Sequence, residues 1–356
     1  TRLKKEKDMD LYTLGHVPWL DSQLIYHAFP RLGMEGLILL APAEPYFCIG
    51  YHQDAEQEVD LTYCREQGIP VFRREVGGGA VYLDGQQLFY QLVIHKDNPL
   101  APKDKGQFYE KLLAPVVQTY KDLGVEVSYK PVNDIVTPEG RKISGNGAAE
   151  IGDYLILVGN LIADFDYETM VRVLRVPDAK FRDKVYKSLH ENLTTLSREL
   201  GQIPSWATMT RALVHNFKTV LGPLTSAELP QAIHDTVKEL AQSHTTEDWL
   251  LKLGRRFRDG RRVRIAEGVE VAQRMHKAPG GLIRATIEME HGQLVGVGLS
   301  GDFFFYPADQ LADLERTLIG AKLSGVKEAI EEFYRVNGIE SPGVTPHDLA
   351  IALGAS

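Results

Sequence analysis

Two segments of this chain combine fixed positive charge with accessible backbone, which is what a phosphate-bearing ligand requires. In the first, Arg73 and Arg74 are followed after two residues by three adjacent glycines, Gly77 to Gly79. Glycines let the backbone approach a ligand closely, and consecutive N–H groups can point into one concavity. Two arginines at the end of a strand can offer bidentate contacts to phosphate or carboxylate. A flexible hairpin with surface arginines is the alternative, but the apolar strand expected after the glycines favours a ligand loop.

The second segment joins Asn133 and Asp134, across a short turn, to Lys142 and the Ser144-Gly145 pair. A lysine on a strand beside a Ser-Gly turn can project a fixed positive charge into a pocket. A nearby aspartate can hold Mg²⁺, and an asparagine can contact a ribose or a phosphate. A hairpin with a solvated lysine is the alternative. The two segments together favour a site for a phosphate compound more than either does alone.

Other residues with reactive side chains have simpler explanations. The sequence Gly-Asp-Phe-Phe-Phe at 301–305 predicts a turn that leads into a strand with aromatic packing. Cys48 is expected in an apolar strand and Cys64 in a short amphipathic helix, so both are expected to be buried, inert thiols. The eleven histidines show no metal-binding spacing, and the chain has no CxxC motif.

The periodicity of apolar residues predicts the elements that must position these segments. The strands expected nearest to them are 69–74, 80–94, 125–135 and 142–163. The other expected helices and strands are 21–32, 36–40, 47–50, 61–67, 107–123, 206–220, 226–242, 247–253, 308–318 and 326–336. This outline predicts a large α/β part, a helical connector at about 203–243 and a compact C-terminal α+β unit.

Composition excludes several classes of function. The 356 residues include 40 Lys+Arg and 48 Asp+Glu, which gives a formal net charge of −8, and 44 % of the residues are apolar. An acidic chain lacks the basic field that nucleic acid or an anionic membrane requires, so neither is expected as a partner. No apolar run reaches the ~20 residues of a membrane span, and the charged N-terminus is unlike a secretory signal. Two cysteines fit a reducing setting, so we expect a cytoplasmic protein.

At the two charged segments the sequence resembles the lipoate–protein ligase family, part of the biotin/lipoate ligase superfamily. The resemblance rests on Arg-Arg-x-x-Gly-Gly-Gly-Ala-Val-Tyr at 73–82, Asn-Asp-Ile at 133–135 and Lys-Ile-Ser-Gly at 142–145. Weaker matches are Gly-Tyr-His-Gln-Asp at 50–54 and Tyr-Lys-Ser-Leu at 186–189. Together with the C-terminal segment, the resemblance covers nearly the whole chain.

The resemblance implies an α+β fold and a two-step activity. A large mixed-sheet catalytic domain of the biotin/lipoate ligase type, residues 1–243, would precede a small α+β accessory domain, residues 244–356. The enzyme would use ATP and Mg²⁺ to convert lipoate (or octanoate) to lipoyl-AMP. It would then transfer the lipoyl group to a lysine of an acceptor protein, either a lipoyl domain or a glycine-cleavage H-like protein.

The family motifs also imply a role for each matching residue. Lys142 would be catalytic, since it would hold the lipoate carboxylate and the α-phosphate together and stabilise the mixed anhydride. Asp134 would hold Mg²⁺. An apolar tunnel for the dithiolane tail would be walled by the strands around Val81, Leu88 and Tyr90. The residues implied to bind ATP or lipoyl-AMP are Arg73, Arg74, Gly77, Gly78, Gly79, Ala80, Tyr82, Gln87, Asn133, Asp134, Ser144, Gly145 and Gly159.

Three departures from the family pattern affect the implied pocket. Leu-Asp at 83–84 stands where the family has His-Asp, and Gln-Gln at 86–87 stands where it has Gly-Asn. Val-Gly-Asn at 158–160 stands where it has His-Gly-Thr. Leu83 and Val158 therefore replace two histidines that are expected to line the acyl-adenylate pocket, which leaves other functions open.

Three alternatives to the ligase follow. An octanoyl or lipoyl transferase of the same fold would form a thioester on a cysteine in the lysine-bearing half of the domain, but the chain has no cysteine after Cys64. A non-catalytic protein that binds lipoyl domains is favoured by the missing histidines and disfavoured by the retained lysine and arginines. A biotin ligase is the weakest alternative, because biotin ligases use a different Gly/Arg loop.

Overall fold

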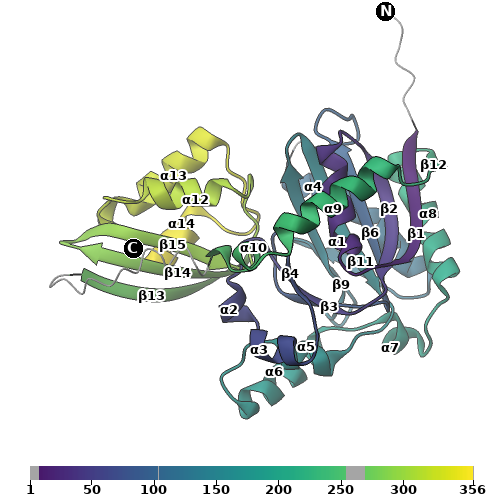
Figure 1. Cartoon of the computed structure of the whole chain (residues 1–356), viewed down its shortest axis with the longest axis horizontal. Helices are drawn as coiled ribbons and strands as arrows, with labels where there is room; N and C mark the ends of the chain where they lie inside the picture. The colour runs from purple at the N-terminus through teal and green to yellow at the C-terminus, as the bar shows by residue number, and fades with distance from the viewer. Residues whose placement is uncertain (1–7, 103, 254–268, 356) are drawn as a thin grey trace, which may run out of the picture. The chain divides into compact units, whose positions relative to one another are not determined.

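The computed structural model describes residues 8–102, 104–253 and 269–355 (Figure 1). Contacts group these residues into two compact units. The first unit comprises 8–47, 63–70, 82–102 and 104–243, and the second comprises 48–62, 71–81, 244–253 and 269–355. The C-terminal residues therefore group with two segments from the first third of the chain. The predicted division into 1–243 and 244–356 does not include that grouping and stays a prediction.

A six-stranded mixed sheet forms the centre of the first unit. Its strands, in spatial order, are β10 (Asn146–Ile151), β11 (Tyr154–Ile162), β6 (Gln87–His95), β2 (Gly36–Pro42), β1 (Met9–Val17) and β12 (Leu224–Ser226). β1 runs parallel to both of its neighbours, and the other pairs are antiparallel. Successive residues of β2 and β6 are buried, so both faces of the sheet are covered at its centre. This is the mixed-sheet α+β architecture that the resemblance implies.

Three long helices pack on this sheet or on one another. α1 (Asp21–Arg31) contacts β2 and β6, and α8 (Trp206–Leu221) contacts β6 and α4 (Lys105–Asp122). Their predicted ends are confirmed to within two residues, because each helix has a clear apolar stripe. α9 (Gln231–His244) begins later than predicted, since β12 continues to Ser226 and a proline precedes the helix.

Several short elements of the chain differ from the prediction. The stretch 125–135 was predicted as one strand but forms β7 (Ser128–Lys130) and β8 (Asp134–Val136), which pair antiparallel in a small sheet with β9 (Lys142–Ser144). The prediction also missed the helices α5 (Tyr167–Val173), α6 (Ala179–Asn192) and α7 (Leu196–Leu200). The remaining short elements near the N-terminal half are β3 (Tyr46–Ile49), α2 (Ala55–Glu58), α3 (Leu61–Glu66), β4 (Val71–Arg73) and β5 (Val81–Leu83).

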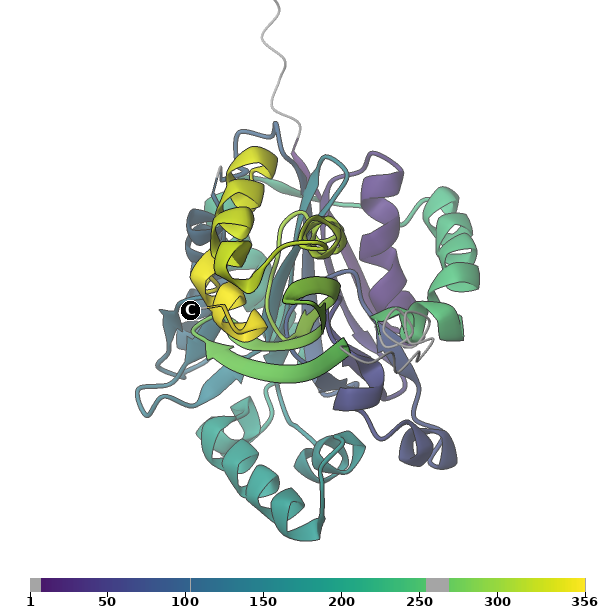
Figure 2. The ribbon, with the colours of Figure 1, turned by 90° about the vertical axis from the view of Figure 1, so that its left-hand side faces the viewer.

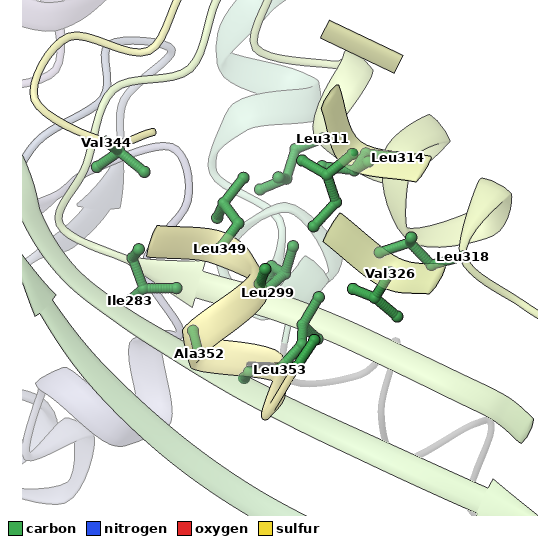
Figure 3. Packing of buried hydrophobic residues seen from close by; sticks show 14 of the residues in the cluster. Ile283, Leu299, Leu311, Leu314, Leu318, Val326, Val344, Leu349, Ala352 and Leu353 are labelled. Carbon is green, nitrogen blue, oxygen red and sulfur yellow. The ribbon is translucent and has the colours of Figure 1, made fainter. Parts of the chain in front are cut away.

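The second unit is built on an antiparallel sheet, β13 (Val269–Ala278), β14 (Gly281–Glu290) and β15 (Gln293–Gly301). Buried and partly exposed residues alternate along β14, so one face of the sheet forms the core. Helices α12 (Gln310–Thr317), α13 (Val326–Asn337) and α14 (Pro346–Leu353) lie on that face (Figure 2). Figure 3 shows Ile283 and Leu299 of the sheet packed against leucines of these helices.

Three details of the second unit correct the prediction. The segment 302–305 follows strand β15 instead of leading into a strand. α14 was not predicted, although Thr345 and Asp348 form a capping box at its start. Helix α10 (Glu247–Leu250) is shorter than the predicted 247–253. Among the described residues, no helix combines the length and the apolar character that crossing a membrane demands.

Candidate active site

Lys142 and Asp134 form an ion pair in the first unit. Both side chains come from the small sheet, where Lys142 of β9 pairs in register with Val136 of β8. The Lys142 Nζ atom lies 2.7 Å from Asp134 Oδ1, and the two side chains are 37 % and 35 % exposed. A pair that is only partly covered can still be reached by a ligand anion. The hairpin predicted from Asn-Asp and Lys-Ile-Ser-Gly therefore brings these two residues together.

Asn146 connects this hairpin to the large sheet. The Asn133 Nδ2 group donates to the backbone carbonyl of Asn146, and Asn146 Nδ2 donates to the Asn133 carbonyl at 2.9 Å. The Tyr90 hydroxyl donates to Asn146 Oδ1, and Ser144 Oγ lies 3.2 Å from the same oxygen. Because Asn133 directly precedes Asp134, these bonds fix the backbone that carries the carboxylate of the ion pair.

Asn160 of β11 forms a second buried network behind the lysine strand. Its Nδ2 group donates to Gln87 Oε1 at 2.7 Å, and its Oδ1 atom accepts from the Gly145 N–H at 2.8 Å. The Ser144 hydroxyl donates to the Asn160 carbonyl at 2.7 Å. Gln87 also donates to the Tyr82 carbonyl at 3.2 Å. Gln87, Ser144 and Gly145 thus make polar bonds within the protein, and their predicted contacts with a nucleotide stay a prediction.

Gly159 is required by the ring of Tyr90. A Cβ atom at position 159 would overlap the Tyr90 hydroxyl and the Asn146 side chain, so only glycine fits without a shift. Burial raises the pKa of Tyr90, which keeps its hydroxyl protonated as a donor. Leu88 and Tyr90 are completely buried, as a wall of the predicted tunnel would be, but the tunnel itself stays a prediction.

Tyr82 is the central residue of β5 (Val81–Leu83) and belongs to the same unit. Its ring meets the Phe165 ring edge to face, with 6.4 Å between centroids. Burial, together with nearby carboxylates, raises the pKa of Tyr82 to about 12, so the phenol is neutral at physiological pH. A neutral hydroxyl can donate to a ligand oxygen.

Arg73, in the second unit, is fully buried and its guanidinium is hydrogen-bonded to backbone carbonyls. The accepting carbonyls belong to Gly50, Tyr51, Gln53, Trp249 and Leu250, at 2.6–3.2 Å. Burial lowers the pKa of Arg73 to about 10, so the group remains charged at neutral pH. These bonds tie strand β4 to the loop before α2 and to helix α10. The Nε, Nη1 and Nη2 groups of Arg73 already donate to these carbonyls. The predicted contact of Arg73 with nucleotide phosphates stays a prediction.

Arg74 holds the glycine loop in the same unit. Its Nη2 group donates to the carbonyls of Gly77 and Gly79, both at 2.8 Å. Gly78 has a φ of +89°, a conformation that favours glycine. A Cβ atom at Gly77 would press on Phe304, and the Gly78 N–H donates to the Phe303 carbonyl at 3.4 Å. The aromatic segment, for which the sequence predicted only strand packing, therefore shapes this loop.

Sequence analysis did not identify the residues that support these groups. Asn146 and Asn160 are the main examples in the first unit, and Phe303 and Phe304 are the examples in the second. One signal was present: Asn160 is an amide inside an otherwise apolar strand, and a buried amide needs partners. Ala80 directly precedes β5, and its predicted contact with a nucleotide stays a prediction.

A divalent cation fits this site only through part of the Asp134 carboxylate. The Oδ1 atom is held by Lys142, and among the described residues no hydrogen bond to Oδ2 is found. Carboxylate oxygens are the ligands that Mg²⁺ prefers, and this ion usually keeps several waters and substrate phosphates. Asp134 could therefore supply one ligand through Oδ2 while it also holds the lysine.

Comparison with known proteins gives the family. A model of the lipoyl protein ligase A/B catalytic domain matches residues 20–218. Lipoate-protein ligase LplJ of Bacillus subtilis is 27 % identical over 304 residues, which covers 85 % of each chain. Octanoyltransferase LipM of Carboxydothermus hydrogenoformans is 24 % identical over 250 residues, 65 % of this chain and 93 % of that protein.

A solved structure shares the fold. It is a bi-partite lipoate protein ligase of Thermoplasma acidophilum, studied with its E2 lipoyl domain, and it is 27 % identical with a TM-score of 0.62. The match covers 69 % of this chain and 97 % of that one. Because the family model spans more than half of the sequence, the chain belongs to the lipoyl protein ligase A/B catalytic domain family, within the biotin/lipoate ligase superfamily.

Proposed function

We propose that this protein is an ATP-dependent lipoate–protein ligase. In the first step, an oxygen of the lipoate carboxylate attacks the α-phosphorus of ATP, the bond to the β-phosphate breaks, and pyrophosphate leaves. In the second step, a lysine amine of the acceptor attacks the acyl carbon, AMP leaves, and the amine proton is released. The similarity to LplJ along most of both chains supports this choice of reaction.

The burial of the two cysteines favours a ligase over a transferase. A transferase that works through a thioester needs an accessible, readily ionised thiol. Cys48 and Cys64 are the only cysteines of the chain, and they are 0 % and 2 % exposed. Burial raises the pKa of Cys48 although the Arg74 guanidinium lies 3.6 Å from its sulfur. Neither thiol is suited to attack an acyl donor, which favours an adenylate as the activated intermediate.

Lys142 is the residue we propose for catalysis. Two anions, the lipoate carboxylate and the α-phosphate, must meet in the first step, and a fixed cation between them offsets their repulsion. The Asp134 carboxylate holds the ammonium group in place before substrate arrives. Charge that is positioned in advance needs little reorganisation as negative charge develops on the phosphate. Mg²⁺ held through Asp134 Oδ2 would neutralise part of the phosphate charge.

The other proposed ligand groups follow from the same chemistry. The backbone N–H groups of Gly77 and Gly79 would contact the adenylate, and Arg74 keeps the loop in shape. Tyr82 and Asn133 would donate to nucleotide oxygens. We propose a lipoyl domain as the acceptor, because the ligase of Thermoplasma acidophilum was studied with its E2 lipoyl domain. An H-like protein is the second acceptor to test.

Release of pyrophosphate tests the proposal directly. The assay uses the full chain with Mg-ATP and, in separate reactions, lipoate, octanoate, biotin or no acid. We expect release that depends on lipoate or octanoate, and label transfer to a lipoyl domain when one is added. No acid-dependent release, with or without the acceptor, contradicts the ligase assignment.

An octanoyl transferase remains the second candidate because of the similarity to LipM. Its test is transfer of octanoate from an acyl carrier protein to a lipoyl domain without ATP. Transfer under those conditions, together with no acid-dependent release of pyrophosphate, would establish the transferase. Binding of the lipoyl domain without any transfer would instead indicate a non-catalytic member.

A further inference from the structure

Helix α6 lies on the surface, and its side chains contribute to no hydrophobic core. None of its 14 residues is buried, and it packs mainly beside α5 (Figures 1 and 2). A polar helix outside the core gains little stability from packing. Its residue types are therefore not set by core packing and can suit the surface of a partner. Phe181 and Tyr186 are nevertheless 48 % and 38 % exposed, and exposed aromatic side chains are typical anchors in protein interfaces.

The charge of this region is opposite to that of the chain. Between Arg172 and Lys187 there are six Lys or Arg residues and two Asp residues, which gives a local charge of +4, whereas the whole chain carries −8. Glu168 and Glu191 flank the stretch, and the Lys187–Glu191 pair at 4.0 Å offsets one of the cations. The cations that remain make this a basic segment of an acidic protein.

Three lysines share one side of α6. Lys180, Lys184 and Lys187 follow one another at intervals of four and three residues, which places them along one face of a helix. Phe181 lies next to the first of them in sequence. This face therefore offers positive charge, and Phe181 and Tyr186 are exposed elsewhere on the same helix.

A groove lies between α5 and α6, lined on α6 by residues other than the three lysines. It has a volume of about 560 Å³, and its charged and aromatic lining residues are Tyr63, Glu168, Arg172, Arg182, Asp183 and Tyr186. The Nε atom of Arg182 is buried and makes no hydrogen bond within the described residues. A buried donor without a partner is costly, and a partner protein that supplies an oxygen would remove that cost.

We propose that α6 and the adjoining groove form the docking surface for the acceptor protein, and that they bind an acidic face of that protein. The inference rests on the proposed function for the identity of the partner. Opposite charges steer two proteins toward each other and set their orientation, and this matters where a lysine must reach an enzyme-bound acyl group. A small acidic domain can face α6 alone, whereas a nucleic acid or a membrane would also meet the acidic remainder of the chain.

Charge reversal on the lysine face tests the proposal. The variant Lys180→Glu with Lys184→Glu changes the charge by −4 at two exposed positions outside the ion pair and the glycine loop. We expect the KM for a lipoyl domain to rise about tenfold, as loss of electrostatic steering allows. We expect lipoate-dependent pyrophosphate release without acceptor to stay unchanged. The fall in kcat/KM with added salt should also become less steep.

The matched control is Lys218→Glu with Lys238→Glu, on exposed positions of α8 and α9. It changes the net charge by the same amount, so an effect of equal size on the acceptor KM would overturn the proposal. An unchanged acceptor KM in the Lys180 and Lys184 variant would overturn it as well. Restoration of the KM by an acceptor with Glu→Lys changes on its acidic face would confirm the contact.

Direct binding separates this proposal from the proposed function. Calorimetric titration of a lipoyl domain into the wild-type protein and the two variants needs no catalysis, so it reports on docking even where pyrophosphate release is absent. Vesicles of phosphatidylserine and a single-stranded oligonucleotide serve as anionic probes. If either probe binds through Lys180 and Lys184 while the lipoyl domain does not bind, the surface serves another partner and the proposal is wrong.

Discussion

The Lys142 Nζ atom lies 2.7 Å from Asp134 Oδ1, across two neighbouring strands of a small antiparallel sheet. In the absence of a bound anionic ligand, the Asp134 carboxylate balances the charge of Lys142. Because each side chain is about one-third exposed, an arriving carboxylate or phosphate can share the ammonium group without first opening the fold. The ion pair is therefore the place in the described structure where fixed positive charge is best prepared for two anionic reactants.

Removal of the lysine should stop adenylation. In Lys142→Ala we expect lipoyl-AMP formation to fall by about 10²–10³-fold or more, the usual effect of losing one group that stabilises developing charge. The melting temperature should change little, since the side chain is partly exposed. Lys130→Ala, at an exposed position of the same small sheet, is the control and should keep full activity. Normal lipoyl-AMP production by the Lys142 variant would show that the cation acts elsewhere.

Replacement of the carboxylate should reveal its role toward metal. Asp134→Asn preserves size and removes the charge that would hold both Lys142 and Mg²⁺. We expect the Mg²⁺ concentration that gives half-maximal pyrophosphate release to rise several-fold. Asp153→Asn, at an exposed position of the turn after β10, should leave it unchanged. A lower maximal rate with no change in Mg²⁺ dependence would mean that Asp134 only positions the lysine.

The sequence was sufficient to predict the hairpin that carries Lys142 and Asp134. It was not sufficient to predict the distant residues that hold the hairpin in place. Lys142 and Asp134 lie eight residues apart, so their meeting follows from one local turn. The Asn160–Gln87 bond joins residues 73 positions apart, and Arg73 reaches carbonyls about 177 positions away. Such partners depend on which strands become neighbours, which no local pattern contains. Helix α6 was missed for a different reason: none of its residues is buried, so it has no apolar stripe to detect.

Loss of the Asn160 side chain should destabilise the first unit. Asn160→Ala leaves the Gly145 N–H and Gln87 Oε1 without their partner in a buried place. Each unsatisfied buried group costs about 1–3 kcal/mol, so we expect the free energy of unfolding to fall by about 2–4 kcal/mol. The measurement is chemical denaturation, with Asn192→Ala on the exposed end of α6 as the control. Equal stability of the two variants would mean that the Asn160 network contributes little.

Arg73 should behave as a structural residue. Arg73→Met keeps an elongated side chain but leaves the accepting carbonyls without a donor, and we expect a loss of about 3–5 kcal/mol, as when one side of a buried charged contact is removed. Arg211→Met, at an exposed position of α8, is the matched control. If the Arg73 variant melts normally but has a raised KM for ATP, the guanidinium contacts the nucleotide instead of holding the backbone.

Both cysteines should be dispensable and slow to react. Because burial raises the pKa of Cys48, less of it is thiolate at pH 8 than in an exposed cysteine, and alkylation by iodoacetamide should be slow in the folded protein. The variant with Cys48→Ala and Cys64→Ala should retain lipoyl transfer, since an adenylate mechanism forms no acyl-cysteine bond. Mass spectrometry of the wild-type protein, quenched in acid during turnover, should find no added octanoyl or lipoyl mass. An acyl adduct on the wild-type protein that is absent from the double variant, together with loss of transfer, would instead establish the thioester mechanism.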